Sequence, residues 1–153
     1  MEHDHSQPSG YRSLMIQTVI GAVIMYLVMF VMIDDLGSFF NNLNMVYMTF
    51  MMVAPMVLLM IVTMRQMFSS PLANTTLIAL SVLAFFGSFA LIRTQTTIGD
   101  RAFLRSMIPH HSGAVLMCRE AKLDDPEVVA LCRAIEQSQT REIEQMKRIL
   151  LRL

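Results

Sequence analysis

The sequence predicts an all-α membrane protein in which three membrane-spanning helices are followed by an antiparallel helical hairpin. Two observations lead to this fold class. The chain of 153 residues is 54% hydrophobic and only 16% charged, which is more apolar than a soluble domain of this size. Three apolar runs of about twenty residues follow one another, and helices of that length match the hydrocarbon core of a bilayer.

We divide the chain into four parts. They are a polar segment (1–12), a membrane region (13–92), a linker (93–99) and a helical hairpin (100–153). The spans are predicted at about 13–33, 44–64 and 72–92, and none of them contains Asp, Glu, Lys, Arg or His. This absence argues against a proton relay or an ion-pair pathway inside the membrane.

Charged residues become frequent after residue 100, and apolar residues recur there at helical spacing. Asp125 is a candidate N-cap with Pro126 in the first helical position, which predicts a break before a second helix. One pair of amphipathic helices buries little surface, so we expect a second hairpin from another copy of the chain to complete a four-helix bundle. The predicted inner positions of the first helix are Phe103, Met107, His110, Ala114, Met117, Cys118 and Ala121. Those of the second are Val128, Cys132, Ile135, Gln139, Glu142, Ile143, Met146 and Leu150.

The inner face of the predicted hairpin gathers side chains that suit copper. Thioethers favour Cu(I), and imidazole binds copper in either oxidation state as well as zinc. The candidate metal residues are Met107, His110, His111, Met117, Gln139, Glu142 and Met146. The alternative without a metal is that the methionines are ordinary core residues and that the polar side chains are solvated or hydrogen-bonded within the hairpin.

Cys118 and Cys132 lie opposite each other when the hairpin is folded about its turn. A disulfide bond is our first interpretation, because it would staple the hairpin in an oxidising compartment. Two small buried thiols are the second, and a thiolate pair for a soft metal is the third.

The stretch Asp100-Arg101-Ala102-Phe103 … Met107-Ile108-Pro109-His110-His111 … Met117, followed by Gln139 … Glu142-Ile143 … Met146, resembles the family called domain of unknown function 305. This resemblance implies a ferritin-like helical bundle that is exported or attached to a membrane. It also implies an association with copper binding and copper tolerance. On this basis we expect Cu(I) to be held by Met107, His110 or His111, Met117 and Met146. Glu142 and Gln139 would orient an imidazole.

Two other features are compatible with copper. Met1, with His3 and His5, resembles an amino-terminal motif for Cu(II) or Ni(II). Methionines recur every three or four residues in the second span, and a Cu(I) path would use Met48, Met52, Met56 and Met60. Repeated M-x-x-x-M in the second of three spans resembles Ctr-type copper transporters. Ordinary packing between helices, or contact with lipid, is the simpler interpretation of these methionines.

The predicted function is copper capture, buffering or tolerance by a membrane-anchored protein. The alternatives are a small Cu(I) transporter and a dimerisation module that binds no metal. We expect no enzymatic activity, because no arrangement of nucleophile, base and oxyanion donors is evident. A formal net charge of zero gives no reason to expect nucleic acid as a partner.

Membrane orientation follows from the charges near the spans. The first loop contains two Asp and no Lys or Arg, and the second contains Arg65, so the hairpin is placed on the outer face of the cytoplasmic membrane. Arg93, Arg101 and Arg105, which follow the third span, favour the opposite orientation.

Overall fold

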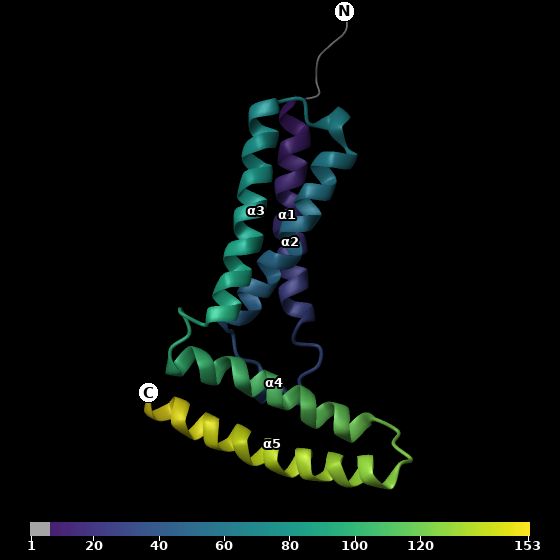
Figure 1. Cartoon of the computed structure of the whole chain (residues 1–153), viewed down its shortest axis with the longest axis vertical. Helices are drawn as coiled ribbons and strands as arrows, with labels where there is room; N and C mark the ends of the chain where they lie inside the picture. The colour runs from purple at the N-terminus through teal and green to yellow at the C-terminus, as the bar shows by residue number, and fades with distance from the viewer. Residues whose placement is uncertain (1–6) are drawn as a thin grey trace, which may run out of the picture. The chain divides into compact units, whose positions relative to one another are not determined.

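The computed structural model describes residues 7–153 and contains five α-helices in that part of the chain, without a strand (Figure 1). The helices are α1 (Gln7–Val28), α2 (Leu43–Thr63), α3 (Pro71–Thr94), α4 (Asp100–Glu120) and α5 (Pro126–Arg152). Short 3-10 turns occupy Leu36–Ser38 and Arg65–Met67. The all-helical fold class predicted from the sequence is confirmed.

The chain forms two compact units, which we describe separately. The span unit contains the described residues up to Leu27 together with Val46–Gln95. The hairpin unit contains Val28–Met45 and Thr96–Leu153. The loop between the first two spans therefore belongs with the hairpin, whereas the sequence analysis had assigned it to the membrane region.

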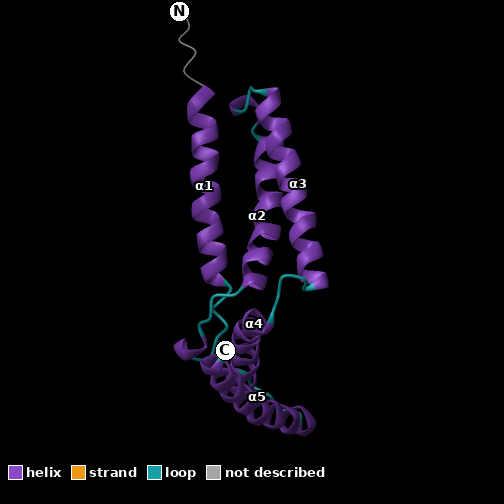
Figure 2. Ribbon diagram, turned by 90° about the vertical axis from the view of Figure 1, so that its left-hand side faces the viewer, coloured by secondary structure: helices purple, strands orange, loops and turns teal. Residues whose placement is uncertain are grey.

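Three helices are long and apolar enough to cross a membrane, as predicted: Gly10–Val28, Leu43–Thr63 and Pro71–Thr94. They run beside one another in Figure 2. The predicted end of the first span at residue 33 is wrong, because the helix ends at Val28. The apolar residues that follow Val28 belong to the loop instead. Phe30 is buried there and its ring lies 4.1 Å from that of Phe39, measured between centroids.

Local contacts fix the ends of the spans. Ser70 caps α3 by accepting a hydrogen bond from the backbone N–H of Ala73, and Pro71 occupies the first turn. The hydroxyl of Tyr11 on α1 donates to Oδ1 of Asn74 at 2.9 Å and accepts from the N–H of Ser70 at 3.1 Å. These bonds tie the start of α1 to the start of α3.

The hairpin is formed by α4 and α5, which run antiparallel as predicted (Figure 1). Asp125 caps α5 by accepting hydrogen bonds from the N–H groups of Glu127 and Val128, and Pro126 begins the helix. Both parts of that prediction are confirmed. Five buried residues form the hairpin core, and Phe40, Met107, Ile149 and Leu150 pack against them. The five are Leu104, Ile108, Val115, Ile143 and Met146.

The loop between α1 and α2 packs on α4. The N–H of Asp34 donates to the hydroxyl of Ser112 at 2.7 Å, and Ser112 is completely buried. Both carboxylate oxygens of Asp34 accept from Nη1 of Arg119, at 2.7 and 2.9 Å. Three spans require this loop and the hairpin to lie on the same side of the membrane, so the contacts agree with the predicted topology.

The predicted inner face of α4 is wrong by about one residue. Leu104, Ile108, His111, Ser112 and Val115 are among the buried positions. Phe103 and Met117, predicted to be inner, are 50% and 53% exposed, and His110 is exposed as well. The reason is that α4 packs against both α5 and the loop, so its small residues Ser112 and Gly113 face protein rather than water.

Candidate metal centre

His111 is the most constrained of the predicted ligands. It lies on the inner face of α4 and is only 7% exposed. Its Nδ1 lies 2.9 Å from the backbone oxygen of Met107, one helical turn earlier. Its Nε2 lies 2.8 Å from Oε2 of Glu142 on α5. The ring is held at both nitrogens, so its direction is fixed.

Both ring nitrogens of His111 face oxygen atoms, so the tautomer decides which of the two contacts is a hydrogen bond donated by the ring. Backbone and carboxylate oxygens are both acceptors, whereas a neutral imidazole has one N–H. When Nδ1 donates to the oxygen of Met107, Nε2 turns a lone pair toward the carboxylate, and a second proton or a cation has to lie between them. A proton suits the 2.8 Å separation. A metal ion needs about 2 Å to each ligand atom, so the half-exposed Glu142 would have to move outward.

Two of the predicted methionine ligands belong to the core of the hairpin or pack against it. Met146 is 8% exposed and belongs to the buried core of the hairpin, and Met107 packs against the same core. Met107 is also the residue whose backbone oxygen holds His111. Met107 and Met146 each lie one helical turn along the chain from His111 and Glu142, respectively. That these four residues form one ligand set stays a prediction.

Gln139 lies one turn before Glu142 on α5. Its side-chain oxygen Oε1 is buried and has no hydrogen-bond partner among the described residues. A buried acceptor without a partner costs free energy, of the order of 1–3 kcal/mol. The predicted role of Gln139, orienting an imidazole, is not seen. Its unpaired oxygen does mark the α5 face next to Glu142 as a place where a donor or a cation would be stabilised.

The predicted ligand set is not brought together as a whole. His110 is exposed, and its ring lies 5.9 Å from that of His111 in an edge-on arrangement. Met117 is exposed and lies six residues beyond His111 on the same helix. Among residues 7–153, no three or more His, Cys, Asp and Glu side chains form a metal-binding group. Of the predicted ligands, the structure thus brings one imidazole and one carboxylate into direct contact, those of His111 and Glu142.

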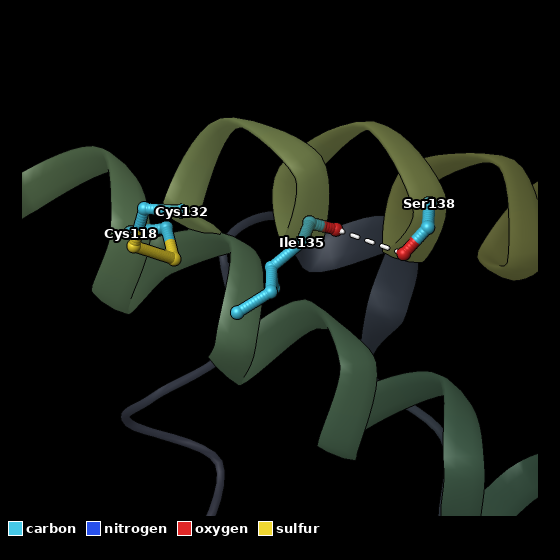
Figure 3. Close-up of a disulfide and its surroundings, with 4 residues drawn as sticks. All are labelled: Cys118, Cys132, Ile135 and Ser138. Atoms are coloured by element: carbon cyan, nitrogen blue, oxygen red, sulfur yellow. Dashed lines mark hydrogen bonds between the residues drawn. A yellow bond between two sulfur atoms is a disulfide. The ribbon is translucent and has the colours of Figure 1, made fainter. Parts of the chain in front are cut away.

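Cys118 and Cys132 form a disulfide bond at the turn end of the hairpin, with a Cα–Cα distance of 5.2 Å (Figure 3). This is the first of the three alternatives that the sequence left open. No free cysteine remains in the described chain. The bond closes a loop between residues 14 apart and fixes the register of α4 against α5, which sets the level at which His111 meets Glu142.

Arg119 follows the disulfide on α4 and joins three segments. It binds Asp34 of the loop and, at 3.4 Å, Oε1 of Glu136 on α5. The nearby charge of Asp34 raises the pKa of Arg119, and the interactions with Glu136 raise it further, against a lowering by desolvation. Arg119 therefore stays charged at any physiological pH and holds the loop against the hairpin.

The methionines of α2 lie beside the interior of the span unit. Met48 and Met52 are 47% and 41% exposed, and Met56 and Met60 are half-buried. The buried face of α2 consists instead of Thr49, Val53, Ala54, Val57 and Ile61. A cavity of about 670 Å³ between α1, α2 and α3 is not lined by any of the four path methionines. The other candidate site, Met1 with His3 and His5, lies outside the described residues.

Comparison with known proteins gives a family for this chain. The family described as domain of unknown function DUF305 matches residues 89–150. Uncharacterized protein L153 of Acanthamoeba polyphaga mimivirus is 33% identical over 119 residues, which cover 76% of each chain. The chain belongs to the DUF305 family. The DUF305 match begins in the last turns of α3 and includes His111, Glu142 and both cysteines. No solved structure matches the chain.

Sequence reasoning missed the residues that lock the loop onto the DUF305 hairpin. Asp34 was counted only among the charges of the first loop, and Ser112 and Arg119 were not singled out. One signal was present: a run of three small residues, Ser112-Gly113-Ala114, directly follows the histidines. A Cβ on Gly113 would lie 3.4 Å from the backbone oxygen of Met32, so a small residue allows the loop to approach.

Proposed function

We propose that this membrane protein captures or buffers copper through its DUF305 hairpin, with Nε2 of His111 as the central ligand. One observation carries the proposal. The Nδ1 of His111 is held by a backbone oxygen while Nε2 points at a half-exposed carboxylate. Metal-binding histidines are held in this way, with one nitrogen bonded to an oxygen so that the other is presented to the metal.

The ligands around His111 favour copper, and Cu(I) in particular. Met107 and Met146 would supply thioethers, which are soft donors that discriminate against calcium and magnesium. Glu142 would either move aside or remain as a weaker ligand at the solvent side. Copper bound here would be held by two helices, so it would also cross-link α4 and α5.

The disulfide supports placing the hairpin on the outer face of the cytoplasmic membrane. Disulfide bonds persist in oxidising compartments and are rare in the cytosol. The acidic first loop packs against the hairpin and agrees with an outside location. A protein anchored there would meet copper before it crosses the membrane.

A second copy of the chain would extend the site. Phe103, His110 and Met117 lie seven residues apart along α4, so they share one exposed face. Pairing this face with its counterpart in another chain would bury two exposed apolar side chains and bring further imidazole and thioether groups together. His110 and Met117 would add ligands only in such a dimer, so the variants below are compared in monomeric protein.

The adjacent histidines provide a matched test. Full-length protein in detergent should bind Cu(I), measured by competition with a chromophoric Cu(I) chelator. His111→Gln should weaken the binding at least tenfold, whereas His110→Gln in the monomer should change it little. Equal effects of the two substitutions, or none, would contradict the assignment of His111.

A second pair of variants tests the thioethers while keeping the core filled. Met107→Leu and Met146→Leu together conserve volume and should cost little stability, because Leu and Met exchange readily in cores. The double variant should lose Cu(I) affinity, and Met117→Leu serves as its control. Unchanged affinity in the double variant would show that these thioethers do not bind copper, and it would refute the proposed Cu(I) site.

A further inference from the structure

We propose that the hairpin unit holds the headgroup of an anionic phospholipid in a basic hollow between α4 and α5. The hollow has a volume of about 350 Å³, and neither His111 nor Glu142 lines it. Its polar side chains are Arg101 and Arg105 on α4 and Lys147 on α5. Its apolar side chains are Phe40, Leu150 and Leu151.

The cations of this hollow, Arg101, Arg105 and Lys147, form no ion pair in the described chain, and no acidic residue lines the hollow. The acidic group near Lys147 is Asp35, whose Oδ1 lies beside Gly37 as Nζ of Lys147 does. Three cations at one concave site repel one another, so an anion that bridges them would be stabilised. Arginine is well suited to phosphate, because its planar guanidinium can donate two parallel hydrogen bonds.

The apolar side of the hollow distinguishes a lipid from a free anion. Leu151 is 91% exposed, and exposed leucine next to three cations matches an amphiphile that has a negative group and a hydrocarbon part. Inorganic phosphate would pair with the cations but would make no apolar contact with Phe40, Leu150 and Leu151. A phospholipid would use both sides.

Chain length alone keeps this hollow close to a bilayer. Arg101 follows the end of α3 by seven residues, a distance of at most about 25 Å even if the chain were fully extended. Phe40 precedes the start of α2 by three residues, or at most about 10 Å. Both connections lead to the same face of the membrane, because two spans separate them. Basic side chains near that surface attract anionic headgroups.

This assignment also accounts for an inconsistency in the charge pattern. Arg101 and Arg105 follow the last span on the side that the proposed function assigns to the outside, where an excess of cations is unexpected. If these arginines bind lipid phosphate, their position is explained by lipid binding and carries no information about the orientation of the protein in the membrane.

The test uses the full-length protein in a neutral detergent, titrated with short-chain phosphatidylglycerol by calorimetry. Phosphatidylcholine of the same chain length is the uncharged comparison, and excess inorganic phosphate is the competitor. We expect saturable binding of phosphatidylglycerol, at least tenfold weaker binding of phosphatidylcholine, and no competition by inorganic phosphate. Comparable affinity for phosphatidylcholine would overturn the proposal, and so would displacement by inorganic phosphate.

Charge-matched variants separate a site from diffuse attraction. The triple variant Arg101→Gln, Arg105→Gln, Lys147→Gln should lose about 100-fold in affinity. The control removes the same charge elsewhere in the hairpin, with Lys122→Gln, Arg133→Gln and Arg148→Gln, and should lose less than a tenth as much. Equal losses would show diffuse attraction and refute the site. Circular dichroism and retention of the Cys118–Cys132 bond check that both variants are folded.

Discussion

The disulfide makes a prediction whose size follows from the structure. Replacing Cys118 and Cys132 by Ser removes a cross-link between residues 14 apart. For a closed loop of about 15 residues, the lost constraint on the unfolded chain is worth about 3 kcal/mol. This is a large part of the stability of a small unit, since whole domains are stable by only about 5–15 kcal/mol.

Hydrogen exchange measured by mass spectrometry reads this loss directly within the hairpin. Core amides of α4 and α5 exchange when the unit opens, so a loss of about 3 kcal/mol should speed their exchange roughly a hundredfold. Amides of the spans should change far less, because they belong to the other compact unit. The full-length protein is compared with and without the two substitutions.

The reduced wild-type protein is the matched control for this experiment. Reduction breaks the same bond without changing any side chain, so it should speed exchange in the hairpin by a similar factor. Acceleration of less than about tenfold in both samples would refute the reasoning. It would mean that the core around Ile108 and Met146, rather than the cross-link, holds α4 and α5 together.

Three further substitutions test the packing, each by chemical denaturation of the full-length protein. Met146→Ala should destabilise the hairpin by about 2–5 kcal/mol, because it leaves a cavity in the core. The control Met117→Ala, at an exposed position, should change the free energy of unfolding by no more than about 0.5 kcal/mol. Equal effects of the two substitutions would contradict the observed core. Ser112→Val should cost about 1–3 kcal/mol, since a loop amide loses its acceptor in a fully buried place, and a neutral effect would argue against the contact between loop and hairpin. Gly10→Ala should destabilise the spans, because its Cβ would lie 2.7 Å from a backbone oxygen. The control Gly87→Ala meets nothing within 4 Å and should be neutral or stabilising. A larger loss of stability in Gly87→Ala than in Gly10→Ala would contradict the packing of α1.

The elements that the sequence predicted well depend on local information. A span needs only its own length and apolarity, and the three spans were found on that basis. The start of α5 was found because Asp125 and Pro126 form a cap with their immediate neighbours. The same locality explains why the antiparallel hairpin was predictable.

The elements that the sequence analysis placed wrongly depend on contacts distant in the chain. Asp34 and Ser112 are separated by 78 positions, and helical periodicity contains no information about such a partner. The loop shifted the buried face of α4 by one residue and shortened the first span by five. At the site, this shift exposes His110, which periodicity placed on the inner face, and buries His111, which was not among the predicted inner positions.

The central claim is that His111 binds copper through Nε2, and X-ray absorption of the copper-loaded full-length protein, kept monomeric in detergent, tests it most directly. We predict a copper environment with both sulfur and imidazole nitrogen neighbours, in which His111→Gln removes the nitrogen contribution and His110→Gln retains it. A spectrum without sulfur, or one in which His111→Gln leaves the nitrogen contribution unchanged, would contradict the account.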